Sequence, residues 1–193
     1  MTWKHTIFYL LIIFNSSCAT HLQKEKNKCP TDYLNNLKVK AWDAERKNNK
    51  LLARDYFEKI CNCLDVEGCL NASSYYSINE PKWLILNEQA CDLGNGNACF
   101  WLGEATKGNI SKAYYEKGCS LPLENADGTS CRMAGAHNID NYDKASSYLE
   151  KGCLLGDIKS CIEAYKIIKE PVRKQRIKKL SCEIGIPEVC KRN

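Results

Sequence analysis

The chain has 193 residues, of which 26% are charged, and its formal net charge is +5 at neutral pH. This small excess does not favour a nucleic-acid partner, for which a strongly basic domain is typical. Thirteen cysteines bring the chain near the density of a disulfide scaffold. Because disulfides persist in oxidising compartments, the composition predicts an exported protein.

The first predicted element is an apolar run, Ile7 to Phe14, that follows Lys4 and His5. A charged start, a short apolar core and small polar residues after it are typical of a signal peptide, so we expect residues 1–17 to be removed. Its eight residues are too few to cross a bilayer, which needs about 20. No other segment approaches that length, so we predict a mature chain without a transmembrane helix.

Two processing sites are compatible with this leader. Ser16-Ser17-Cys18 resembles the end of a bacterial lipobox, which would make Cys18 the lipidated first residue. Ser17-Cys18-Ala19 fits ordinary cleavage after Ala19. We favour lipidation, because residues 18–28 are polar and would form a flexible tether to a membrane anchor. Either site removes Cys18 from the free thiols and leaves twelve cysteines.

Residues 29–193 are predicted to form a single repeat domain of about five two-helix units. Their cysteines recur in pairs. The second cysteine of one pair and the first cysteine of the next pair are 22, 20, 22 and 21 residues apart along the chain. A fixed period of this kind without strand-like alternation indicates a helical solenoid. Five disulfides are predicted, which join Cys61 to Cys69, Cys91 to Cys99, Cys119 to Cys131, Cys153 to Cys161 and Cys182 to Cys190.

Each unit is predicted to place one cysteine near the end of a helix and the other in the first turn of its antiparallel neighbour. A helix stop between the two lets these turns face each other across a disulfide. Glycines three residues after the first cysteine suit the left-handed conformation that ends many helices, and they are Gly94, Gly156 and Gly185. The residue before the first cysteine is small in four units, which would allow close helix contacts: Ala90, Gly118, Gly152 and Ser181.

Two further cysteines lie outside these pairs. Cys63 takes the place of a leucine or isoleucine in the other units, and Cys29 takes the second-cysteine position of a unit without an upstream helix. We favour a sixth disulfide, Cys29–Cys63. The alternative is Cys18–Cys29, which requires an uncleaved or unlipidated Cys18, and sequence alone does not settle connectivity.

One unit carries a recognisable pattern, Ala-x-x-Tyr-Leu-Glu-Lys-Gly-Cys-x-Leu-Gly, from Ala145 to Gly156, followed by Ser160-Cys161. It resembles the Sel-one-like repeat family and, more narrowly, the Helicobacter cysteine-rich proteins, over about Cys61 to Cys190. The resemblance implies an all-α solenoid of antiparallel helix pairs, similar to tetratricopeptide repeats and stapled by disulfides. It also implies beta-lactam binding or slow beta-lactam hydrolysis as an alternative function.

The sequence contains little that supports catalysis. No serine is followed by lysine three residues later and K-T-G is absent, so the elements of serine beta-lactamases are missing. Cys61, Cys63 and Cys69 lack a nearby histidine and the spacing of a zinc site. We therefore expect no metal site, no cofactor and no catalytic residue.

Binding is the predicted function, since helical solenoids form grooves for peptides and proteins. Of the recurring aromatic residues, most are expected in the core, among them Trp42, Trp83, Trp101 and Tyr148. Two adjacent pairs cannot both face inward from one helix, and they are the candidate binding residues: Tyr75, Tyr76, Tyr114 and Tyr115.

The densest basic run, from Lys169 to Lys179, is interpreted as a solvated helix face and not as a nucleic-acid site. We predict an exported scaffold, either an outer-membrane or periplasmic lipoprotein or a secreted protein. Its ligands would be proteins or peptides, with cell-wall fragments as a further class. Contact with a membrane is expected only through the lipid anchor, and no oligomeric state is predicted.

Overall fold

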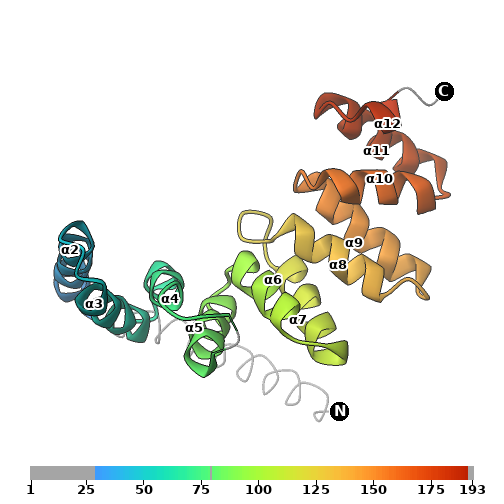
Figure 1. The fold of residues 1–193 in the computed structure, drawn as a ribbon. Helices are drawn as coiled ribbons and strands as arrows, with labels where there is room; N and C mark the ends of the chain where they lie inside the picture. The colour runs from blue at the N-terminus through green and yellow to red at the C-terminus, as the bar shows by residue number, and fades with distance from the viewer. Residues whose placement is uncertain (1–28, 79, 191–193) are drawn as a thin grey trace, which may run out of the picture. The chain divides into compact units, whose positions relative to one another are not determined.

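The computed structural model describes residues 29–78 and 80–190, and every regular element in these ranges is an α-helix (Figure 1). The predicted all-α fold is confirmed. The predicted signal peptide, the tether and Cys18 lie outside the described residues. The helices are α2 (Thr31–Arg46), α3 (Lys50–Asn62), α4 (Val66–Ser73), α5 (Pro81–Asp92), α6 (Gly96–Ala105), α7 (Gly108–Ser120), α8 (Gly128–His137), α9 (Tyr142–Leu154), α10 (Ile158–Ile167), α11 (Pro171–Glu183) and α12 (Pro187–Cys190).

The chain divides into two compact units, residues 1–72 and 73–193, where the sequence predicts a single repeat domain. The boundary falls at the end of α4. A repeat chain has no single central core, since each repeat packs only on its neighbours. Compact units can therefore separate at a junction between repeats.

In the first unit, α2 packs on α3 as an antiparallel pair. Trp42 on α2 meets Phe57 on α3 edge to face, with ring centroids 5.2 Å apart. Asn48 turns the chain with a positive φ of 56°, and the Asn49 side chain accepts a hydrogen bond from the Leu52 amide at 3.3 Å, which caps the start of α3. Local residue choice and packing thus specify the same hairpin.

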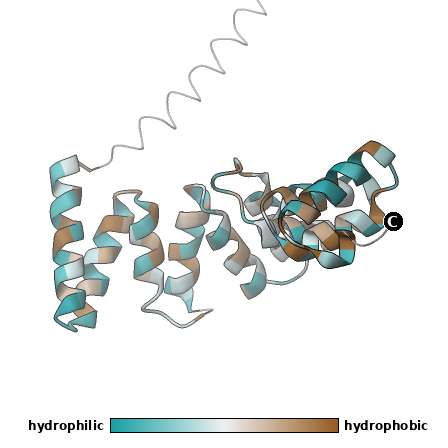
Figure 2. Ribbon diagram, turned by 90° about the horizontal axis from the view of Figure 1, so that it is seen from above, coloured by the Kyte–Doolittle hydropathy of each residue, from teal (hydrophilic) through white to brown (hydrophobic). Residues whose placement is uncertain are grey.

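In the second unit, each helix from α5 to α11 packs on the next along the chain. Hydrophobic and hydrophilic residues alternate along these helices (Figure 2), and those buried between them are mostly alanine, cysteine and aliphatic residues. One buried cluster extends from α9 to α12 and contains Leu149, Cys153, Cys161, Ala164, Ile168, Ile177, Ile186 and Val189. The predicted solenoid of helix pairs is confirmed.

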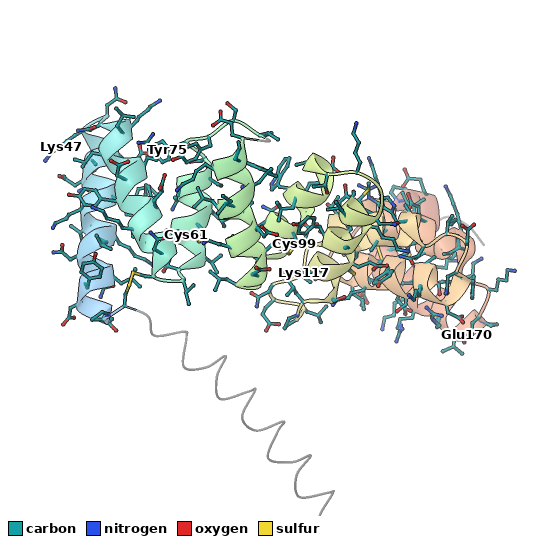
Figure 3. The ribbon with its side chains drawn as sticks, turned by 90° about the horizontal axis from the view of Figure 1, so that it is seen from below. Lys47, Cys61, Tyr75, Cys99, Lys117 and Glu170 are labelled. Atoms are coloured by element: carbon teal, nitrogen blue, oxygen red, sulfur yellow. A yellow bond between two sulfur atoms is a disulfide. The ribbon has the colours of Figure 1, made fainter. Side chains whose placement is uncertain are left out.

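Within the described residues, six disulfides staple consecutive helices (Figure 3). The sixth predicted pairing, Cys29 with Cys63, is present with a Cα–Cα distance of 5.3 Å and ties the start of α2 to the end of α3. The other five have Cα–Cα distances of 4.4 to 5.2 Å and join Cys61 to Cys69, Cys91 to Cys99, Cys119 to Cys131, Cys153 to Cys161 and Cys182 to Cys190.

The second cysteine of a pair lies in the first turn of its helix, as predicted. Cys99 is the fourth residue of α6 and Cys131 the fourth residue of α8, and both are fully buried. The loop that Cys131 closes is four residues longer than the loop that Cys99 closes. Its extra residues fold back on the start of α6, where the Asn125 carbonyl accepts the Gly96 amide at 2.9 Å. The longer loop therefore still allows a disulfide between the end of one helix and the first turn of the next.

The turns between stapled helices depend on residues with positive φ. Gly94, Gly156 and Gly185 have φ values of 94°, 84° and 78°, as expected for helix stops. Leu64 occupies the same position in the first unit with φ 63°, so that turn lacks the glycine that the conformation favours. Two glycines before cysteines allow close helix contacts, because a Cβ added to Gly152 would lie 2.3 Å from the Ser160 hydroxyl and one added to Gly118 would lie 2.8 Å from the Ser130 hydroxyl.

Candidate functional site

The two adjacent tyrosines of α7 differ in burial. Tyr115 is only 2% exposed, so it is a core residue and not a surface contact. Its hydroxyl hydrogen-bonds the Glu104 carboxylate, and its ring stacks on His137 at 5.6 Å. Burial, together with the Glu104 hydrogen bond, raises the pKa of Tyr115 to about 12. Tyr115 therefore packs α7 on its neighbours.

Tyr114 is the outward member of that pair and is half-buried. Its hydroxyl donates to Glu88 Oε1 at 3.0 Å, which links α7 to α5. Burial is the main cause that raises the pKa of Tyr114, and the Glu88 hydrogen bond adds to it. Tyr75 and Tyr76, in the segment after α4, are both half-buried, so each keeps part of its surface accessible to solvent.

The other aromatic residues are less buried than predicted. Trp42 and Trp101 are 43% and 44% exposed, and Tyr148 is half-buried, so the expectation that most aromatic residues lie in the core is wrong. Only Trp83 and Tyr115 of the set are buried. The helices approach each other through alanine, glycine and cysteine, which leaves little volume for large rings between them. The rings therefore lie at the edges of the helix contacts.

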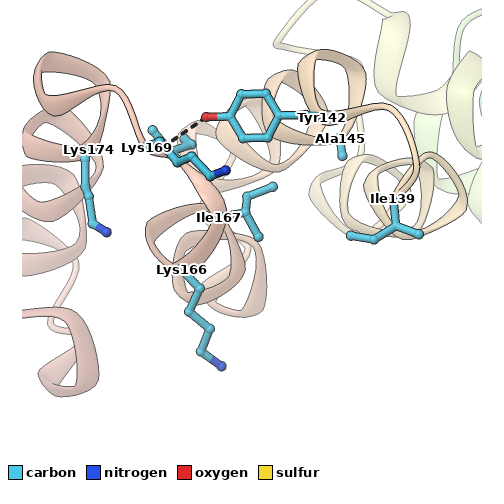
Figure 4. Close-up of a pocket in the computed structure, with 8 residues that line it drawn as sticks. Ile139, Tyr142, Ala145, Lys166, Ile167, Lys169 and Lys174 are labelled. Carbon is cyan, nitrogen blue, oxygen red and sulfur yellow. Dashed lines mark hydrogen bonds between the residues drawn. The ribbon is translucent and has the colours of Figure 1, made fainter.

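A groove that the sequence did not predict runs over α8, α9, α10 and the start of α11, and Figure 4 shows the pocket at its Tyr142 end. It consists of two adjoining pockets of about 340 and 280 Å³, which share Ile139, Lys166 and Ile167. We call it the α8–α11 groove. Its lining also includes Gly135, Ala136, Tyr142, Ala145, Leu149, Glu163, Ile168, Lys169 and Lys174.

The apolar walls of the groove come from the connection between α8 and α9 and from the core. Ile139 lies in the connection from α8 to α9 and is 63% exposed. Its neighbour Asn138 is buried, and the Asn138 side-chain amide donates to the Ala134 carbonyl at 2.8 Å and to Glu116 Oε1 at 2.7 Å. Ile168, which is fully buried, belongs to the core cluster below. The exposed side chain of Ile139 thus lies beside the buried core residue Ile168 in the lining of the groove.

Tyr142 closes one end of the groove. It begins α9, and its hydroxyl oxygen accepts the Lys169 backbone N–H at 3.0 Å (Figure 4). The Lys169 ammonium lies 5.9 Å from the same ring. This contact joins the start of α9 to the connection between α10 and α11, which fixes the spacing of the two walls.

The groove is positively charged. Lys166, Lys169 and Lys174 line it, and within residues 29–78 and 80–190 none of their ammonium groups forms an ion pair with a carboxylate. Lys174 instead lies 4.7 Å above the Tyr165 ring. Among the described lining residues Glu163 is the one carboxylate, and it belongs to the second pocket alone.

The neighbouring arginines have a structural role. Glu150 on α9 is buried, and its carboxylate pairs with Arg173 at 2.8 Å and with Arg176. The Arg173 guanidinium also donates to the Ser146 hydroxyl at 3.3 Å. These contacts hold α11 against α9, and the single carboxylate offsets one of the two guanidinium charges.

The lining residues of the groove are mostly apolar and basic. Neither pocket has serine, cysteine or histidine among its described lining residues, so these residues do not include a serine or cysteine nucleophile with a histidine base. In the part of the chain that the structure describes, no cluster of three or more metal-binding side chains is present. None of the helices in that part is long and apolar enough to span a bilayer.

Comparisons with known proteins do not assign the chain to a family. No protein-family model matches it, and no curated protein matches it. The groove could have been suspected from the sequence only in part, because the basic run supplies Lys169 and Lys174 whereas Ile139 and Tyr142 lie about 30 residues earlier.

Proposed function

We propose that the protein is an exported scaffold that binds a polypeptide segment in the α8–α11 groove. The observation that carries the proposal is the exposed apolar pair Ile139 and Tyr142 beside three lysines without carboxylate partners among the described residues. Binding sites are concave and mostly apolar, with a few polar groups that fix orientation. The groove has this composition, and its residues come from α8 to α11 and the connections between them, where a disulfide joins α9 to α10 and a buried ion pair joins α9 to α11.

The cellular setting is part of the proposal. The disulfides indicate an oxidising environment. We propose further that residues 1–17 are a signal peptide and that Cys18 is lipidated, which would make the protein an envelope lipoprotein. The pattern around Ala145 to Gly156 supports placing it among Sel-one-like repeats. Mass spectrometry of the intact mature protein tests both processing routes, because a lipid on Cys18 and cleavage after Ala19 give different masses.

Site-specific photo-crosslinking tests the binding function. A photoreactive amino acid replaces Ile139 in cells that export the full chain, and a second variant carries it at Leu51, which is similarly exposed on α3. We expect a protease-sensitive adduct from position 139 and none from position 51. Equal adducts from both positions, or none from position 139, would contradict the proposal. Nitrocefin turnover by the oxidised protein tests beta-lactam hydrolysis, which the resemblance alone implies.

A further inference from the structure

We infer that the occupant of the α8–α11 groove is an acidic segment of a partner protein, in which apolar side chains precede neighbouring carboxylates. This inference rests on the proposed function and names the class of ligand. It follows from the chemistry of the lining and from the way in which charge is distributed along it.

The apolar part of the ligand is indicated by the shared centre of the two pockets. Ile139 and Ile167 line both pockets, and Leu149 and Ile168 continue the apolar surface on either side. The volumes of about 340 and 280 Å³ suit one or two side chains of the size of leucine or phenylalanine. When the apolar side chains of the ligand enter the pockets, they and Ile139 are both removed from water, which stabilises the complex.

The charge of the ligand is indicated by the end of the groove at Tyr142. Lys169 and Lys174 line this end only, whereas Glu163 lines the other end only. The Tyr142 hydroxyl oxygen already accepts the Lys169 amide hydrogen, so its own hydrogen can be donated to an incoming carboxylate. Charge-assisted hydrogen bonds from lysine and tyrosine would hold carboxylates at this end. The groove therefore has a direction, with the acidic part of the ligand beside Tyr142.

A broad anionic surface fits less well. Such a surface needs an extended cationic face, and Arg173 and Arg176 on α11 are engaged with the buried Glu150. The carboxylate of Glu163 would also repel an anionic polymer that lay along the whole groove. A short acidic segment with apolar residues on one side avoids both conflicts.

Fluorescence anisotropy with the oxidised full-length protein tests the inference. Three labelled, end-capped peptides share the segment Gly-Ser-Leu-Phe and then continue with Asp-Glu, Asn-Gln or Lys-Lys. We expect the acidic peptide to bind about tenfold more tightly than the amide peptide, since each exposed ion pair contributes up to about fivefold in affinity. We expect the basic peptide to bind most weakly. Added salt should reduce the difference in affinity between the acidic and amide peptides.

Two lysine variants make the test specific. The Lys169→Gln/Lys174→Gln protein should bind the acidic peptide about tenfold more weakly and the amide peptide almost unchanged. The matched control is Lys107→Gln/Lys159→Gln, which removes two exposed lysines outside the groove and should leave both affinities unchanged. Circular dichroism checks that each variant keeps its helices.

The outcomes separate the inference from the proposed function. One outcome is that the acidic and amide peptides bind with equal affinity and that Ile139→Ser weakens the binding of both. This result would overturn the inference of an acidic ligand and leave the proposed peptide binding intact. Failure of all three peptides, together with an adduct at position 139 in cells, would also overturn this ligand class alone. Anionic phospholipid vesicles or muropeptides that bind more tightly through the same two lysines would overturn it in favour of a non-protein ligand.

Discussion

Gly103 on α6 packs directly against the ring of Tyr115 on α7. A Cβ added to Gly103 would lie 2.4 Å from Tyr115 Cε1, closer than non-bonded carbon atoms approach. The ring cannot easily move, because its hydroxyl is hydrogen-bonded to Glu104 and its other side faces His137. The absence of a side chain at position 103 therefore allows α6 and α7 to pack at this separation.

Gly103→Ala is expected to destabilise the second unit by about 2 kcal/mol, as overpacking of a core does. The same change in a Tyr115→Leu background should be neutral or stabilising, because alanine favours a helix over glycine by about 1 kcal/mol once the ring is gone. Urea unfolding of the four proteins of this double-mutant cycle measures the coupling. Additive effects of the two changes would contradict the packing relationship.

The pKa of Tyr115, raised to about 12, gives stability a dependence on alkaline pH. Tyrosine in the unfolded chain titrates near about pH 10. Between about pH 10 and 12 the unfolded state has therefore lost a proton that the folded state keeps, so stability falls as pH rises through this window. Below about pH 10 the contribution is fully present.

Spectrophotometric titration of the tyrosines measures this effect. We expect a phenolate component that appears only near about pH 12, and Tyr115→Phe should remove it. Tyr33→Phe on α2 is the control and should leave that component unchanged. A component near about pH 12 that persists in Tyr115→Phe would show that another tyrosine is responsible.

The buried Glu150 makes a second stability prediction. Glu150→Gln leaves Arg173 and Arg176 without their carboxylate, and we expect a loss of about 2 kcal/mol. Both arginines are partly exposed, which keeps the loss below that of a fully buried pair. Thermal or urea unfolding measures it.

The matched control is Glu183→Gln, at the end of the same helix as the arginines. Its exposed carboxylate lies 3.9 Å from Lys179, so the change should alter stability by less than about 0.5 kcal/mol. Equal losses from the two substitutions would show that burial of Glu150 contributes nothing.

The disulfides should differ in their contributions according to loop length. Cys153 and Cys161 are eight positions apart, and loop closure predicts that removing their bond as a pair of serines destabilises by about 2.5 kcal/mol. Cys29 and Cys63 are 34 positions apart, which predicts about 4 kcal/mol. Each loss is measured by urea unfolding of the double-serine protein.

Peptide mapping without reduction is the independent check on these bonds. We expect a cross-linked peptide that contains Cys29 and Cys63, and another that contains Cys153 and Cys161. A larger loss of stability from the short loop than from the long one would show that loop closure does not govern these bonds. A map with different partners would show that the connectivity is wrong.

The fold could be predicted because its signals are local. The spacing of Cys153 and Cys161 places both sulfurs at a helix turn, and Gly156 between them has the positive φ that such a turn requires. The hydrophobic period of the helix, the residue that ends it and the disulfide that joins it to the next helix all lie within one repeat. The pairing of Cys29 with Cys63 required the repeat register as well, because these residues are far apart in the chain.

The groove could not be predicted in the same way. Ile139 and Tyr142 are about 30 residues from Lys169 and Lys174, and no repeat position relates them. They meet because α9 packs on α10 and the following connection returns to the start of α9, where Tyr142 accepts the Lys169 amide. Burial of the aromatic residues could not be predicted either, since it depends on how closely the helices approach.

The amino-acid sequence by itself determined the helices, their stops and the cysteines that join them, because hydrophobic period, turn conformation and disulfide reach all act over fewer than about 35 residues. Only the tertiary structure decided which side chains face solvent together. That Lys169 lies beside Tyr142 while Arg173 turns to Glu150 follows from the packing of α11 on α9, and such contacts between distant residues have no periodic signal in the chain.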